Sequence, residues 1–261
     1  MIEVRGLHKS FGEKNVLVGV DLEINDGWTM CIIGKSGCGK SVLLKNIVGL
    51  MYPDKGYVKM NGKIISEMKQ KELYNLRADI GFVFQGAALF DSYTVFENVI
   101  LHQWEHGVRD LSMLEKEAMK VLSAVGLLPN IAERENDNFK KEWKILKHKK
   151  PADLSGGMKK RVGVARALVG SPRYIFYDEP TTGLDPVTSI QIDQLIAELA
   201  KKFNVTSIVI THDLFSVYEV ADQVIMLNDG RVEFAGTPEE LKKTNKAAVK
   251  EFLYRYETCI L

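Results

Sequence analysis

The segment TMCIIGKSGCGKSVLLKNIVGL, residues 29–50, limits the possible folds of this chain more than any other. Its first residues form a continuous apolar run, which predicts a buried strand. Its end, SVLLKNIVGL, has the apolar spacing of a helix. Between them, residues 34–41 fit the pattern G-x-x-x-x-G-K-[ST], which requires a preceding strand and a following helix. The segment therefore predicts an α/β fold with a phosphate-binding loop.

Each position of this loop has a chemical reason. Glycines let successive backbone N–H groups point at one phosphate, and the following helix adds its positive end. The ammonium of Lys40 would face the β- and γ-phosphates, and the hydroxyl of Ser41 would ligate Mg²⁺. We expect Lys40 to be a loop residue outside the core, and an accidental glycine turn is the alternative interpretation. The predicted nucleotide-binding residues of the loop are Gly34, Lys35, Ser36, Gly37, Cys38, Gly39, Lys40 and Ser41.

A second candidate site follows the apolar run RYIFY, which predicts another buried parallel strand. Two carboxylates, Asp178 and Glu179, come next, at the edge of the sheet where α/β folds bind ligands. Asp178 would hold Mg²⁺, and Glu179 would act as the general base that polarises an attacking water. A solvated acidic turn is the alternative, which the phosphate loop in the same chain disfavours.

Three further side chains stand where strands are predicted to end. His212 follows an apolar, β-rich run, so its ring could contact the γ-phosphate and orient the attacking water. Gln85 follows IGFVF, and its neutral amide could ligate Mg²⁺. Phe11 follows the first predicted strand and could stack on adenine or pack as a core aromatic. For a lone histidine or glutamine, a structural role is the usual alternative.

The composition restricts the partners. A net charge of +1 gives no reason to expect electrostatic binding to nucleic acid or to an anionic membrane. Three cysteines without C-x-x-C spacing indicate reduced thiols, not a disulfide scaffold or a zinc site. The apolar runs are far shorter than the roughly 20 residues of a membrane-spanning helix. If the protein serves a membrane, we expect a partner to supply the spanning part.

The order of the predicted elements indicates a parallel α/β sheet that is interrupted by a helical lobe. Strands alternate with helices, but residues from about 92 to 170 have a mostly helical pattern. Within this block, residues 130–150 contain seven basic and four acidic residues, and we interpret them as a solvated helix or an inserted loop. Further on, TPEELKK predicts a helix that begins with a capping box of Thr237 and Glu240.

Taken in order, the phosphate loop, Gln85, LSGGM, YDEP, TTGLD and His212 resemble the motifs of the nucleotide-binding subunit of an ABC transporter. The resemblance covers about residues 1–235, and the LSGGM signature is highly specific for this family. It implies a P-loop domain with a RecA-like sheet core, an N-terminal antiparallel β part and a helical subdomain inserted at about residues 88–170. Residues 236–261 would form a C-terminal helical tail. The implied activity is hydrolysis of ATP with Mg²⁺.

The resemblance also explains why one chain carries two anion-binding turns. In this family, two subunits pack head to tail, and each ATP lies between the phosphate loop of one and the signature of the other. Ser155, Gly156 and Gly157 would therefore contact the γ-phosphate bound by a second copy of the chain. By the same resemblance, Asp185 is the tip of the D-loop, and Phe11 stacks on adenine.

One branch of the family is the most similar. FQGAALFDSYTVFENV, and Met158 in the signature position usually taken by glutamine, resemble the ATPase subunit of Mla/Mce-type lipid transporters. This resemblance implies a cytoplasmic subunit, peripheral on the inner face of the cell membrane of a bacterium. It would act through a separate integral membrane permease and move phospholipid between membranes. A lipid-binding substrate protein would be a further partner, and no nucleic acid is expected.

Three other functions remain as alternatives. The ATPase of a small-solute importer would share every catalytic residue. Only Met158 and residues 86–90, where a permease helix should dock, distinguish it. A non-transport ABC ATPase of DNA repair or translation generally needs a long coiled coil, zinc-ligand cysteines or tandem domains, and none is present in this sequence. A phosphate-loop kinase would not explain LSGGM.

Overall fold

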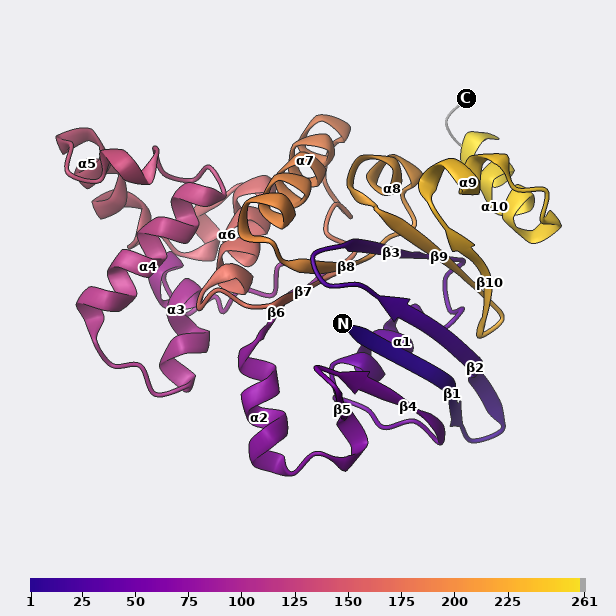
Figure 1. The fold of residues 1–261 in the computed structure, drawn as a ribbon. Coiled ribbons are helices and arrows are strands. Elements are labelled where there is room, and N and C mark those ends of the chain that lie inside the picture. Colours follow the sequence, from indigo (N-terminus) through magenta and orange to yellow (C-terminus); the bar gives the residue numbers. More distant parts are fainter. Residues whose placement is uncertain (259–261) are drawn as a thin grey trace. The chain divides into compact units, whose positions relative to one another are not determined.

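The computed structural model describes residues 1–258 and divides into two compact units (Figure 1). The first unit consists of Met1–Arg77 together with the chain from Asn204 onward, and the second consists of Ala78–Phe203. Cys259 and the last two residues of the expected C-terminal tail lie outside the described residues.

The first unit contains two sheets and the helices that cover them. Its strands are β1 (Ile2–Phe11), β2 (Lys14–Ile24), β3 (Thr29–Ile33), β4 (Lys55–Met60), β5 (Lys63–Ile64), β8 (Thr206–Ile210), β9 (Gln223–Asn228) and β10 (Arg231–Gly236). Its helices are α1 (Lys40–Ile47), α2 (Gln70–Ala78), α8 (Leu214–Val220), α9 (Pro238–Lys243) and α10 (Ala247–Thr258), with a 3₁₀ turn η1 (Ile65–Glu67).

The two sheets differ in how their strands run. One is antiparallel, in the order β2-β1-β4-β5, as expected for the N-terminal part of the chain. In the other, β3 lies between β8 and β9 and runs parallel to both, and β10 pairs antiparallel with β9. Every residue of β3 and β8 is buried, which accounts for their continuous apolar runs. The predicted α/β class with an antiparallel N-terminal part is therefore confirmed.

The second unit is mostly helical. Its elements are β6 (Ile80–Val83), α3 (Val95–Glu105), α4 (Leu111–Ala124), η2 (Ile131–Glu133), α5 (Asp137–Leu146), η3 (Pro151–Asp153), α6 (Gly156–Leu168), β7 (Tyr174–Asp178) and α7 (Pro186–Phe203). Strands β6 and β7 pair in parallel, with Val83 opposite Tyr177, so both end at the same edge. Figure 1 shows α3, α4, α5 and α6 as neighbouring helices of this unit.

Local capping signals decide where several helices begin. Thr94 and Glu97 form a capping box that starts α3, and Asp110 accepts bonds from the first N–H groups of α4. The helical pattern expected from about residue 92 onward therefore begins with two separate helices, α3 and α4. Thr237 and Glu240 form the predicted capping box of α9.

The charged segment at residues 130–150 is a helix with one buried face. In α5, Phe139, Trp143 and Leu146 are buried at the i, i+4, i+7 spacing of one helix side. The ring of Trp143 meets that of Phe96 on α3 edge to face, at 5.9 Å between centroids. Of the two expected alternatives, the structure shows the helix and not the loop. Its charged side is solvated as expected, but its apolar side is buried, and Trp143 on that side contacts α3.

No helix within residues 1–258 has the length and apolar character needed to span a membrane.

The packing of α5 leads to a stability prediction. Phe139 is only 1% exposed, so Phe139→Ala should destabilise the protein by about 3–5 kcal/mol through lost burial and an unfilled cavity. The matched control is Lys141→Ala on the exposed side of the same helix, which should leave the urea midpoint unchanged. Equal midpoints for the two variants would contradict a packed α5.

Candidate nucleotide-binding site

The phosphate loop joins β3 to α1 in the first unit. The backbone of Gly34 has φ +147°, and a Cβ there would lie 2.3 Å from the carbonyl oxygen of Leu227 and 2.7 Å from the Sγ atom of Cys38. Only glycine fits such a position. The next three residues, Lys35, Ser36 and Gly37, are exposed, so the outer part of the loop is open to a ligand. This arrangement suits a phosphate group bound by backbone N–H groups.

The side chain of Lys40 is hydrogen-bonded to the backbone of the loop. Its Nζ atom donates to the carbonyl of Gly34 at 2.7 Å and to that of Lys35 at 3.1 Å, and the residue is only 9% exposed. It is also the first residue of α1. The expectation of a loop residue outside the core was therefore wrong. A buried ammonium needs hydrogen-bond acceptors, and the backbone of the loop supplies them.

Cys38 fills space in the loop. Burial raises the pKa of its thiol, and the ammonium of Lys40 opposes that rise. The thiol therefore stays protonated at neutral pH, where a thiolate would be the reactive form. Its structural contribution is steric, because its Sγ atom lies where a side chain at position 34 would have to stand.

Other predicted residues of the first unit stand at element ends. Phe11 ends β1 and is 49% exposed, so it is not a core aromatic, and the Nζ atom of Lys9 lies 5.9 Å from its ring centroid. His212 is exposed and follows β8 by two residues. Lys35 forms an ion pair of 3.1 Å with Glu251, which connects the phosphate loop to α10.

The two predicted carboxylates lie at the end of β7 in the second unit. Asp178 is the last residue of the strand, and both Asp178 and Glu179 are half-buried. Glu179 has φ +51°, a left-handed conformation that is uncommon for any residue other than glycine. Its carboxylate accepts from the hydroxyl of Thr182 at 3.1 Å. Backbone strain of this kind clusters at functional sites.

Gln85 follows β6 and is exposed, but its backbone carbonyl is held by a hydrogen bond. The ammonium of Lys160, on α6, donates to the carbonyl of Gln85 and lies 3.4 Å from the carbonyl of Glu179. Burial lowers the pKa of Lys160, and the charge of Glu179 opposes this shift. The structure thus brings Gln85 and Glu179 to the same cation. The sequence analysis missed Lys160, whose only signal was its place in the helix after LSGGM.

The signature residues begin α6. Ser155 is the N-cap, and its Oγ atom accepts from the N–H of Met158 at 3.3 Å. A Cβ on Gly157 would lie 3.0 Å from the Cγ2 atom of Thr188, so the signature lies directly beside α7. Asp185 accepts from the N–H of Thr188 at 3.0 Å and from its hydroxyl at 2.6 Å. These bonds lower the pKa of Asp185 and give it a capping role on α7 that the sequence did not suggest.

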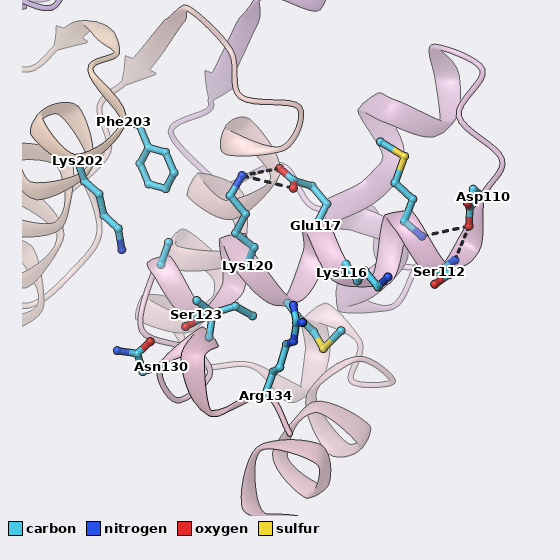
Figure 2. A pocket seen from close by; sticks show the side chains of 14 residues that line it. Asp110, Ser112, Lys116, Glu117, Lys120, Ser123, Asn130, Arg134, Lys202 and Phe203 are labelled. Atoms are coloured by element: carbon cyan, nitrogen blue, oxygen red, sulfur yellow. Dashed lines mark hydrogen bonds and ion pairs between the residues drawn. The ribbon is translucent and has the colours of Figure 1, made fainter. Parts of the chain in front are cut away.

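A cavity of about 820 Å³ on α4, η2 and the end of α7 contains none of these residues. Figure 2 shows that its lining mixes cations with carboxylates. Lys120 pairs with Glu117 at 3.4 Å, and Asp110 accepts from the N–H of Ser112 at 2.9 Å. Because Lys120 and Glu117 pair with each other and Asp110 caps the N-terminus of α4, we assign the cavity no part in nucleotide binding.

The known proteins that are similar to this chain belong to one family. Residues 17–182 match the ABC transporter family. The probable ribonucleotide transport ATP-binding protein of Mycobacterium leprae is 36% identical over 97% of this chain and 68% of its own. The methionine import ATP-binding protein MetN of Carboxydothermus hydrogenoformans is 40% identical over 89% of this chain and 65% of its own.

A phospholipid-transport relative matches over most of its length. The intermembrane phospholipid transport system ATP-binding protein MlaF of Haemophilus influenzae is 34% identical over 97% of this chain and 90% of its own. Among solved structures, the dimeric ATP-binding cassette MJ0796, in a post-hydrolysis state bound to ADP and Pi, has a TM-score of 0.77. It is 32% identical and covers 91% of this chain and 99% of its own.

The position of Lys40 leads to a prediction for ATP turnover. Lys40→Met should abolish hydrolysis, because it removes the only charge of the loop that is held by the carbonyls of Gly34 and Lys35. The methionine keeps most of the apolar stem, so the variant should remain folded. Phosphate release from MgATP, with circular dichroism as the control for folding, checks both parts. A folded variant with unimpaired turnover would contradict a phosphate-binding role for the loop.

Proposed function

Because this chain belongs to the ABC transporter family and carries its ATPase domain, we propose that it powers a transporter that moves phospholipid between membranes of a bacterial envelope. The match to the H. influenzae protein carries this proposal, because it extends over 90% of that protein, which no solute-transport relative described above reaches. Met158 in the signature favours the same branch. The methionine-import and ribonucleotide-transport relatives support the alternative, an importer of small solutes.

We propose that the domain extends over residues 1–235, with a helical subdomain at about 88–170 and a tail at 236–261. Its substrate is ATP with Mg²⁺. Within the described residues, no group of three or more His, Cys, Asp or Glu side chains could hold a metal ion alone. Magnesium instead prefers oxygen ligands from one or two carboxylates and from substrate phosphates. The hydroxyl of Ser41, the amide of Gln85 and the carboxylate of Asp178 are donors of that kind.

The reaction is in-line attack of water on the γ-phosphate. Glu179 is the general base that polarises this water, and His212 orients it against the γ-phosphate. The bound magnesium ion would neutralise charge on the β- and γ-phosphates. Phe11 offers an exposed ring for stacking on adenine.

Two copies of the chain would form the active assembly. We propose that the signature residues of one copy, Ser155, Gly156 and Gly157, bind the γ-phosphate held by the phosphate loop of the other. The exposed start of α6 at Ser155 supports this, because a helix N-terminus attracts anions. The dimeric state of the MJ0796 cassette supports it as well.

The partner in the membrane would be a separate permease, which holds the subunit on the cytoplasmic face. Residues 86–90 are the proposed docking loop. Phe90 is 51% exposed, which favours docking over the alternative of packing in the helical lobe. A cavity of about 460 Å³ beside it is lined by apolar groups that include Phe84 and Leu101. A lipid-binding protein of the same transporter is the third proposed component.

The assignment of Glu179 predicts a trapped dimer. Glu179→Gln should bind ATP but hydrolyse it very slowly, because the carboxylate that polarises water is lost while Asp178 remains. Size-exclusion chromatography with MgATP should then show a dimer, and the same variant with ADP serves as the control. A variant that stays monomeric with ATP, alone and with its permease, would argue against the shared site.

Transfer of lipid decides between the two transport functions. The subunit, copurified with its permease and reconstituted in vesicles, should move fluorescent phospholipid to acceptor vesicles only when ATP is present. Phe90→Asp should reduce this transfer, because burying a carboxylate in a permease contact costs several kcal/mol, while the free subunit keeps its ATPase activity. ATP-driven uptake of a water-soluble solute without lipid transfer would assign the protein to the importers.

A further inference from the structure

One buried cation of α6 reaches two backbone segments of the second unit. Lys160 is 6% exposed, and its ammonium donates to the carbonyl of Gln85 and lies 3.4 Å from the carbonyl of Glu179. The two acceptors follow β6 and β7, which are paired in parallel and end at the same edge. An ammonium has three donors, so a single lysine can serve both carbonyls.

The acceptors are carbonyl oxygens, not carboxylates, so Lys160 acts on backbone geometry. A buried cation without such partners is strongly unfavourable, so the two carbonyls and the ammonium stabilise one another. Glu179 has φ +51°, a conformation that is retained only where its surroundings hold it. The donor at its carbonyl is one of the contacts that do so.

The same helix also contacts the residues that follow Gln85; residues 85–90 are called the Gln85 loop from here on. Ala87 and Ala88 have φ +61° and +45°, and the guanidinium of Arg166 donates to their carbonyls at 2.7 and 2.8 Å. Helix α6 also touches β6 directly, since a Cβ on Gly81 would lie 2.1 Å from the carbonyl oxygen of Ala167. Helix α6 is therefore joined to β6 by close backbone packing and to the loop that follows β6 by side-chain hydrogen bonds.

We propose that Lys160 is a positioning residue that fixes the backbone at Gln85 and at Glu179 to the signature helix, so that these three parts move together. The inference rests on the proposed function, in which Gln85 serves magnesium and Glu179 polarises water. Ser155, which would meet the nucleotide of the second copy, begins the same helix. A shift of α6 at that contact would reach both side chains of its own copy through Lys160.

The consequence is an effect on turnover and not on ATP affinity. Lys160 contacts the segments that carry the reacting groups, whereas the phosphate loop belongs to the other unit. Small misplacement of catalytic groups can lower turnover by about 100-fold. Removal of the ammonium should therefore lower kcat and leave the binding of nucleotide nearly unchanged.

The test compares four full-length proteins: wild type, Lys160→Met, Lys160→Arg and Lys159→Met. Lys160→Met should lower kcat for MgATP by about tenfold or more, with the Kd for a fluorescent ATP analogue within about threefold of wild type. Lys160→Arg should recover most of kcat, because the guanidinium keeps several donors. Lys159→Met removes the same charge from the neighbouring position of α6 and should behave as wild type.

Two outcomes would overturn the inference. One is a folded Lys160→Met protein with wild-type kcat. The other is a loss of ATP affinity that matches the loss of kcat, which would assign Lys160 to nucleotide binding. If Lys160→Met does not fold, Lys160→Gln takes its place, because its amide retains two N–H donors but no charge and should give an intermediate kcat. A wild-type kcat in Lys160→Gln would contradict the need for a charged side chain at this position. A wild-type protein without ATPase activity would instead refute the proposed function itself.

Discussion

The hydrogen bonds from the ammonium of Lys40 to the carbonyls of Gly34 and Lys35 are the interaction on which the phosphate loop depends. A charge that is 9% exposed must be satisfied by acceptors, and here the chain that it closes supplies them. Gly34 can take part only because it has no Cβ to clash with Leu227. Strand β3, the loop and the start of α1 are thereby held in one geometry, in which the outer loop residues 35–37 stay exposed.

In the second unit, cationic side chains also donate hydrogen bonds to backbone carbonyls, but they join segments that are distant in the sequence. Lys160 and Arg166 are cations on one helix whose acceptors are backbone carbonyls of the Gln85 loop. Lys40 closes a local turn, whereas these two side chains reach residues more than 70 positions away in the sequence. These long-range hydrogen bonds attach the loop to helix α6. They also stabilise the left-handed residues of the loop in one conformation. The proposed catalytic role of the loop requires a single backbone conformation, because the exposed side chain of Gln85 would have to return to the same position in each round of hydrolysis.

In the proposed function, ATP hydrolysis and the choice of transported substrate depend on different parts of the chain. The proposed groups for hydrolysis, such as Lys40 and Glu179, would act identically whether the transporter carries phospholipid or a small solute. In the proposed assembly, the permease would select what is moved, so the surface of this chain that meets it would distinguish the two functions. In the second unit the proposed docking surface is the short loop at residues 86–90 with the exposed ring of Phe90. The buried amide of Asn98 holds this loop, because it bonds to both the N–H and the carbonyl of Phe90.

The sequence by itself determined the local elements and the chemistry of the motifs. Continuous apolar runs predicted β3, β7 and β8 because strands buried on both faces need them, and Thr237 with Glu240 predicted the start of α9 because a capping box is local. The roles of Gln85, Glu179 and His212 remain predictions from motif and family. Only the tertiary structure decided that α5 is packed, since the partner of Trp143 is Phe96 on another helix. It also decided the place of Lys160, because the acceptors of a buried side chain are chosen by the fold and leave no periodic trace in the sequence.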